Sequence, residues 1–156
     1  MFHRVLYPTD FSACAQRALG ALTMLKEAGC EVVVVLHVLD EGQIDLVAWG
    51  LGELGEPVEE NLSLILERRR GRAEELLAGV QAEIEAAGMQ VVPLLRYGVP
   101  FREILEAADE EGISLVIIGS HGRSNLAEIL LGSVCDKVVH NARQSVLVVK
   151  REPPCT

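Results

Sequence analysis

The alternation of short apolar runs with helical patterns is the feature that most restricts how this chain can fold. Five runs, rich in branched aliphatic side chains, cover residues 5–7, 32–39, 91–97, 115–118 and 146–149. Between them, apolar residues recur at helical spacing within 11–25, 62–87, 104–108 and 134–139. Strands that alternate with helices form right-handed crossovers into a parallel sheet. The sequence therefore predicts a doubly wound α/β fold with helices on both faces.

Three residues refine this prediction. Pro93 lies inside the third run and has no N–H group for a sheet hydrogen bond, which indicates an edge strand. Gly29 and Gly88 follow helical patterns, where C-terminal caps are expected.

The stretch 41–57 interrupts the alternation. It contains four glycines and the only tryptophan, Trp49, among apolar side chains. A mobile flap over a site, a subunit contact and an ordered surface excursion all fit this composition.

The overall charge limits the classes of ligand. Fourteen Lys and Arg against 23 Asp and Glu give a net charge of −9, which argues against a nucleic-acid partner or an anionic membrane. Phosphates would have to be held locally, by main-chain amides, one or two cations and a metal ion.

The length of 156 residues predicts one domain, residues 1–156. No signal peptide or apolar run of about 20 residues is found, which favours a cytoplasmic location and no membrane contact. Scattered Cys14, Cys30, Cys135 and Cys155 fit reduced thiols.

Polar loops follow the first and fourth runs, at the edge where doubly wound sheets bind ligands. The first loop is Pro8-Thr9-Asp10-Phe11-Ser12, and the second extends from 119 to 125. Gly119, Gly122, Gly132 and Ser133 form a G-x2-G-x9-G-S pattern.

This pattern suits phosphate binding. Gly119 and Gly122 can adopt backbone angles closed to other residues and let a ligand approach the main chain. Gly132, Ser133 and Val134 offer N–H groups at a helix N-terminus, and Arg123 adds a cation. Explanations without a ligand also fit: a strand end, a turn, and a capping box between Ser133 and Asp136.

Asp10 has two interpretations: a helix cap, or an acceptor for both hydroxyls of a ribose. His37, within an apolar run, is interpreted as a packed histidine and His140 as a surface residue. His121 fits a phosphate contact or a solvent-facing position. The run 68–70, three arginines, is predicted to be a solvated helix face.

The chain resembles the ATP-binding branch of the universal stress protein family. The resemblance rests on Pro8-Thr9-Asp10-Phe11-Ser12, Leu36-His37-Val38, Gly98-Val99-Pro100 and the run from Gly119 to Val134. It implies a five-stranded sheet in the order 3-2-1-4-5 and a homodimer formed through the last strand, between Val146 and Val149. Ser145 stands where many relatives have proline, and 41–60 has no reliable match.

The resemblance also implies roles at the site. Pro8, Thr9 and Val38 would line an adenine pocket, while Asp10 and Gly119 would contact the ribose. Gly122, Gly132, Ser133 and Val134 would hold the phosphates of ATP (or of ADP or AMP), with Mg²⁺ or Mn²⁺.

The leading hypothesis is an ATP-binding regulatory protein of the stress-response type, a nucleotide-dependent switch. The alternative is a slow or partner-dependent ATPase or nucleotide-transferring enzyme, although no general base is evident. An interaction protein with an empty pocket and a flavin carrier are weaker alternatives. The resemblance also suggests a protein partner, which hydrolysis would require.

Overall fold

The sheet confirms the predicted topology. The structure, a computed structural model, describes residues 2–123 and 130–152. Its strands are β1 (Arg4–Pro8), β2 (Val32–Asp40), β3 (Gln90–Gly98), β4 (Leu115–Gly119) and β5 (Ser145–Val149). All neighbouring strands pair in parallel in the order 3-2-1-4-5. Pro93 lies on the edge strand β3, as its missing N–H group predicts.

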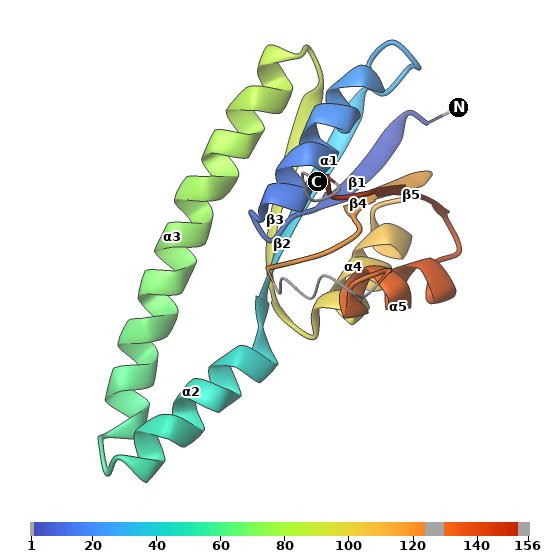
Figure 1. Cartoon of the computed structure of the whole chain (residues 1–156). Coiled ribbons are helices and arrows are strands. Elements are labelled where there is room, and N and C mark those ends of the chain that lie inside the picture. The colour runs from blue at the N-terminus through green and yellow to red at the C-terminus, as the bar shows by residue number, and fades with distance from the viewer. Residues whose placement is uncertain (1, 124–129, 153–156) are drawn as a thin grey trace.

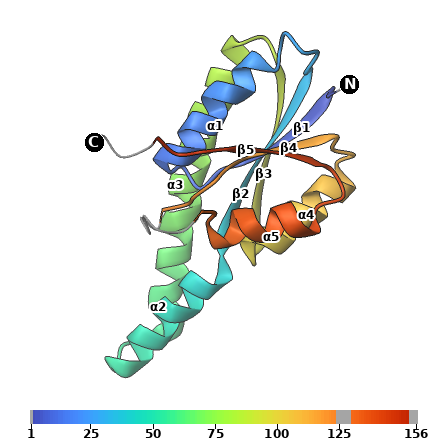
Figure 2. The ribbon, with the colours of Figure 1, turned by 45° about the vertical axis from the view of Figure 1, so that its right-hand side comes forward.

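Two layers of helices cover the sheet (Figures 1 and 2). The helices are α1 (Ala13–Met24), α2 (Glu41–Glu53), α3 (Val58–Ala86), α4 (Pro100–Glu110) and α5 (Ser133–Asn141). Val5 and Tyr7 of β1 pack toward α1 and α3, whereas Leu6 between them packs toward α4 and α5. This alternation follows from the two-residue period of a strand, and it gives the sheet an apolar core on each face.

The helix ends are fixed by local chemistry. Ser12 is the N-cap of α1, and its hydroxyl accepts a hydrogen bond from Ala15 N at 3.2 Å. Gly88 directly follows Ala87, the C-cap of α3, and has a left-handed φ of 85°. This confirms the prediction that Gly88 belongs to the C-terminal cap of the helix. Gly29, with φ of 91°, closes a short turn beyond α1.

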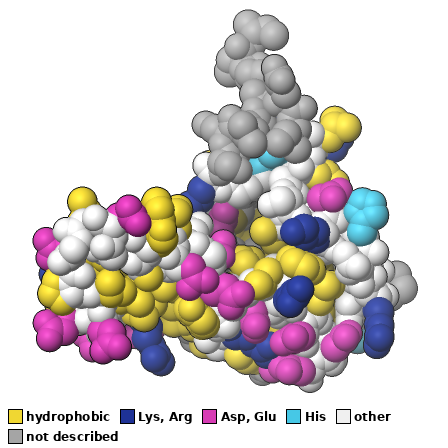
Figure 3. Space-filling view, turned by 90° about the horizontal axis from the view of Figure 1, so that it is seen from below, with side chains coloured by type: hydrophobic (Ala, Val, Ile, Leu, Met, Phe, Trp, Pro, Cys, Tyr) yellow, Lys and Arg dark blue, Asp and Glu magenta, His cyan; other side chains and the backbone are white. Residues whose placement is uncertain are grey.

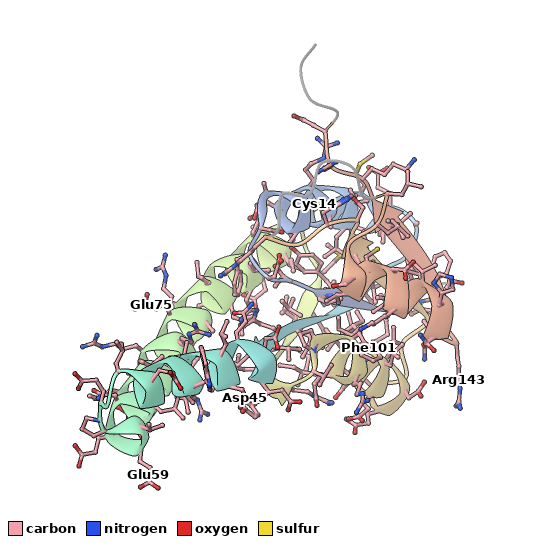
Figure 4. All side chains as sticks on the ribbon, turned by 60° about the horizontal axis from the view of Figure 1, so that its bottom comes forward. Cys14, Asp45, Glu59, Glu75, Phe101 and Arg143 are labelled. Carbon is pink, nitrogen blue, oxygen red and sulfur yellow. The ribbon has the colours of Figure 1, made fainter. Side chains whose placement is uncertain are left out.

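The stretch 41–57 is mostly helix rather than a break in regular structure. Residues 41–53 form α2, and α3 begins at Val58, before the predicted helical stripe. Residues 41–67, which we call the arm, project from the body as a pair of helices (Figure 1). In Figure 4, Asp45 marks the base of the arm and Glu59 its far end. The segment is thus an ordered excursion from the body, while a subunit contact and a flap over the site stay predictions.

The arm is sparsely packed. Ile44 is the one buried residue of α2, whereas Leu46, Trp49 and Leu54 are exposed. Figure 3 shows the arm on the left with hydrophobic side chains at its surface.

Cys14, Cys30 and Cys135 are buried and free, while Cys155 lies outside the described residues. Burial raises the pKa of Cys135 to about 11, so this thiol stays protonated at neutral pH. No helix in the described part of the chain is long and apolar enough to cross a membrane.

Candidate functional site

A cavity of about 600 Å³ opens at the carboxyl edge of the sheet, a typical size for a small-molecule site. Its wall comes from the ends of β1, β2 and β4, from the starts of α4 and α5, and from one side of α3. Figure 3 views the molecule from this side. All the site residues predicted from the sequence lie in this wall: Pro8, Thr9, Asp10, Val38, Gly119, Gly122, Arg123, Gly132, Ser133 and Val134.

The turn after β1 fixes the position of Asp10. Its Oδ1 accepts a hydrogen bond from Ser12 N at 3.0 Å, and Thr9 Oγ1 accepts one from Phe11 N at 3.0 Å. Phe11 has a left-handed φ of 61°, which only a well-supported turn imposes on a bulky side chain. Because Ser12 caps α1, Asp10 is not the helix cap, and its second oxygen is turned toward the neighbouring loop.

The loop after β4 lies directly against Asp10. A Cβ atom on Gly122 would stand 2.8 Å from Asp10 Oδ2, closer than such atoms approach. From the next position, Arg123 Nε donates a hydrogen bond to the carbonyl oxygen of Asp10 at 3.1 Å. The two predicted loops therefore form one surface.

The glycines of the motif serve close approach rather than unusual backbone angles. Gly119, Gly122 and Gly132 all lie outside the left-handed region, so the expectation of special angles at Gly119 and Gly122 is wrong. A Cβ on Gly119 would stand 3.0 Å from the carbonyl carbon of Cys14 in α1. One on Gly132 would stand 3.3 Å from both His121 Cα and Ser120 O. Side chains at these positions would push the backbone segments apart.

The N-terminus of α5 is not capped by a side chain. Gly132 is its N-cap and Ser133 its first helical residue, so the predicted capping box of Ser133 and Asp136 is absent. Gly132 N donates to Ser120 O at 2.7 Å and is therefore not available to a ligand, contrary to the sequence-based expectation. The N–H groups of Ser133 and Val134 have no acceptor among the described residues.

The structure confirms that His37 is a packed histidine, and this residue also lines the cavity. Its Nδ1 donates to the carbonyl oxygen of Thr9 at 2.7 Å, because a carbonyl oxygen can only accept. Its ring centroid lies 4.6 Å from that of Phe11. Burial lowers the pKa of His37, which keeps the ring neutral at physiological pH.

Of the two other histidines considered in the sequence analysis, one lies at the cavity and one on the outer surface. His121 lines the cavity, and its Nδ1 lies 2.8 Å from the hydroxyl of Ser120. His140 is exposed on α5 with its Nδ1 2.8 Å from the carbonyl oxygen of Asp136, as expected of a surface residue.

Three arginines of α3 were missed as site residues. Arg68, Arg69 and Arg72 line the cavity. The prediction of a solvated face holds for Arg68 and Arg70, which are exposed, whereas Arg69 is half-buried. A signal was present, because Arg69 lies four residues before the buried Ala73 and thus on the inward stripe of α3.

The charge of the cavity wall opposes that of the whole chain. Among the described residues, it includes four arginines (Arg68, Arg69, Arg72 and Arg123) and two carboxylates, Asp10 and Asp40. A net positive wall in a chain of charge −9 favours a negatively charged ligand.

Comparison with known proteins identifies the family. The model of the universal stress protein family matches residues 1–150. Universal stress protein MJ0577 of Methanocaldococcus jannaschii is 38% identical over 157 residues that cover 97% of each chain. The solved structure of MJ0577 matches with a TM-score of 0.87 and 37% identity, covering 97% of this chain and 98% of that one. Universal stress protein YxiE of Bacillus subtilis is 33% identical over 159 residues, 96% of this chain and 100% of its own length. On these matches, the chain belongs to the universal stress protein family.

Proposed function

We propose that this protein binds ATP, or a related adenine nucleotide, in the cavity and acts as a nucleotide-dependent regulatory protein of the stress response. The observation that carries the proposal is the combination of donors and acceptors in one wall. The uncapped N–H groups of α5 suit phosphates, and the carboxylate of Asp10 suits ribose hydroxyls. The surrounding arginines favour an anion in an otherwise acidic chain.

Each part of the nucleotide has a place in this proposal. Asp10 keeps Oδ2 for the ribose, because Oδ1 already accepts from Ser12 N. Ser133 N and Val134 N bind phosphate oxygens, while Gly122 and Gly132 keep the loops close enough to form the site. The remaining predicted residues complete the wall, with adenine against Pro8, Thr9 and Val38, ribose against Gly119, and phosphate near Arg123.

Two proteins of the same fold have been solved with adenine nucleotides. One universal stress protein, 21% identical with a TM-score of 0.65, is in complex with cAMP. Another, from Archaeoglobus fulgidus, 23% identical with a TM-score of 0.61, is in complex with dAMP. The fold can therefore hold such ligands in those proteins, which supports testing them here.

A divalent cation would be held mainly by the nucleotide itself. Mg²⁺ and Mn²⁺ prefer oxygen ligands, and the carboxylates that the described residues contribute to the cavity wall are Asp10 and Asp40. No group of three or more His, Cys, Asp or Glu side chains suited to a metal ion occurs within the described residues. Phosphate oxygens would thus supply most of the coordination.

The regulatory role is proposed ahead of the enzymatic alternative. Both carboxylates of the wall already accept a backbone N–H: Asp10 from Ser12 and Asp40 from Gly42, each at 3.0 Å. Neither is placed as a dedicated general base, so hydrolysis stays an alternative that no particular observation favours.

We also propose that β5 pairs with β5 of a second copy. β5 is an edge strand, and Leu147 on it is 39% exposed. Leu147→Lys is expected to convert the dimer into a monomer, because antiparallel pairing would bring two lysines together in a desolvated contact. Sedimentation equilibrium measures this change. A variant that stays dimeric would exclude this edge as the interface.

Thermal unfolding tests the nucleotide proposal. Ligand at about 100 times its dissociation constant adds about 2.7 kcal/mol to the free energy of unfolding. For a chain of this size, we expect ATP with Mg²⁺ to raise Tm by about 5–10 °C. An unchanged Tm with ATP, ADP and AMP, together with no heat of binding in calorimetry, would contradict the proposed function.

Asp10→Ala tests the ribose contact. Loss of hydrogen bonds to a charged group is expected to weaken ATP binding by about 1.5–3 kcal/mol, measured by calorimetry. Asp10→Asn is the matched control, because its amide oxygen can still accept from Ser12 N and hold the turn. Wild-type affinity in Asp10→Ala would mean that Asp10 only shapes the loop.

A further inference from the structure

Arg68 and Arg69 differ from Arg72, the third arginine that α3 contributes to the cavity wall, because neither has an ionic partner among the described residues. Within residues 2–123 and 130–152, neither forms an ion pair. By contrast, Arg70 pairs with Glu74 at 3.2 Å, and Arg72 pairs with Glu75 at 3.4 Å. Glu75 lies on the side of α3 away from the body in Figure 4. The two unpaired guanidinium groups are therefore the cations most available to a ligand.

Their position places them across the cavity from the N-terminus of α5. α3 packs on the sheet face that α1 also covers, and it contacts β2 and β3. α5 packs on the opposite face with α4. A ligand in the cavity thus has N–H donors on one side and arginines on the other.

The charge of a triphosphate exceeds what the α5 side can neutralise. A helix N-terminus contributes about half of an elementary positive charge. Arg123, the cation on that side, already donates Nε to the carbonyl oxygen of Asp10. The donors on the α5 side can bind one phosphate group, whereas each additional phosphate group adds negative charge that needs a further cation. A guanidinium group can form two parallel hydrogen bonds to phosphate oxygens.

We propose that Arg68 and Arg69 bind the outer phosphates of the nucleotide and so select a triphosphate over a monophosphate. The inference rests on the proposed function and deepens it, because it names residues that would distinguish nucleotides by their number of phosphate groups. Both arginines stand where the arm (residues 41–67) joins the body. Their contact with the outer phosphates therefore links the length of the phosphate chain to the base of the arm.

Calorimetric titration with ATP and with AMP, at fixed Mg²⁺ and ionic strength, tests the proposal. The variant Arg68→Gln/Arg69→Gln keeps most of each side chain and removes both charges. We expect its affinity for ATP to fall at least about 10-fold and its affinity for AMP to change less than about 2-fold. Arg68→Lys/Arg69→Lys keeps the charges and should recover part of the preference for ATP.

Arg70→Gln is the matched control, because this exposed neighbour is absent from the cavity wall and pairs with Glu74. It should bind both nucleotides as the wild type does. An unchanged ratio of ATP to AMP affinity in the double variant would overturn the inference without contradicting the proposed nucleotide site. Wild-type protein that binds neither nucleotide would refute the proposed function itself.

Discussion

Gly122→Val is expected to abolish nucleotide binding without unfolding the protein. The added Cβ would stand 2.8 Å from Asp10 Oδ2, and the two further methyl carbons of valine would crowd the same side of the loop. Asp10 cannot simply turn away, because its Oδ1 holds Ser12 N at 3.0 Å. The carboxylate would leave the position proposed for the ribose contact. We expect at least about 100-fold weaker binding of ATP in calorimetry, or about 2.8 kcal/mol.

The fold should survive this change, since the atom that valine meets belongs to a side chain at the rim of a cavity rather than to the backbone. Circular dichroism and Tm check this. Gly20→Val is the control: no atom lies within 4 Å of a Cβ built at Gly20, so binding should be unaffected. A folded Gly122→Val protein with wild-type affinity would show that the ligand does not depend on Asp10 and Gly122.

The fold was predictable because its signals are local. Each apolar run is bounded by polar, glycine or proline residues, and Pro93 marks the edge strand through a single missing donor. The site residues also follow from position along the chain. Asp10 and Gly122 come after strands that turn out to be neighbours, and parallel neighbours end at the same edge of the sheet.

α2 was not predictable from local signals. Gly42, Gly50 and Gly52 each lower the stability of a helix by about 1 kcal/mol relative to alanine, so the segment reads as a break. The helix begins at Glu41, after the N-cap Asp40, whose Oδ1 accepts from Gly42 N, and it packs along α3. Such tertiary contacts outweigh propensity and leave little trace in the sequence.

The surroundings of Arg68 and Gly119 could not be predicted from the sequence for a different reason. A run of arginines shows that a helix surface is charged, but the cavity beside Arg68 depends on how α3 packs across β2 and β3. Likewise, a glycine at the end of a strand does not reveal which segment approaches it. At Gly119 that segment is the start of α1.

Gly119→Val is therefore expected to lower stability strongly. A Cβ at this position would lie 3.0 Å from the carbonyl carbon of Cys14, 3.1 Å from its oxygen and 3.1 Å from its Sγ. Overfilling a packed contact usually costs about 1–3 kcal/mol, and a β-branched side chain against backbone atoms belongs at the upper end. We expect a loss of about 3 kcal/mol, which lowers Tm by about 6–12 °C in thermal unfolding without ligand.

Two variants separate backbone crowding from other effects of losing a glycine. Gly79→Ala removes a glycine from α3 where a Cβ meets nothing within 4 Å, so Tm should stay or rise. Adding Cys14→Ala to Gly119→Val removes Sγ but leaves the carbonyl group in place, so only part of the lost stability should return. Full recovery would mean that the thiol alone crowds Gly119. Wild-type Tm in Gly119→Val itself would mean that α1 can move away from β4, and the close approach of this helix would no longer explain the glycine.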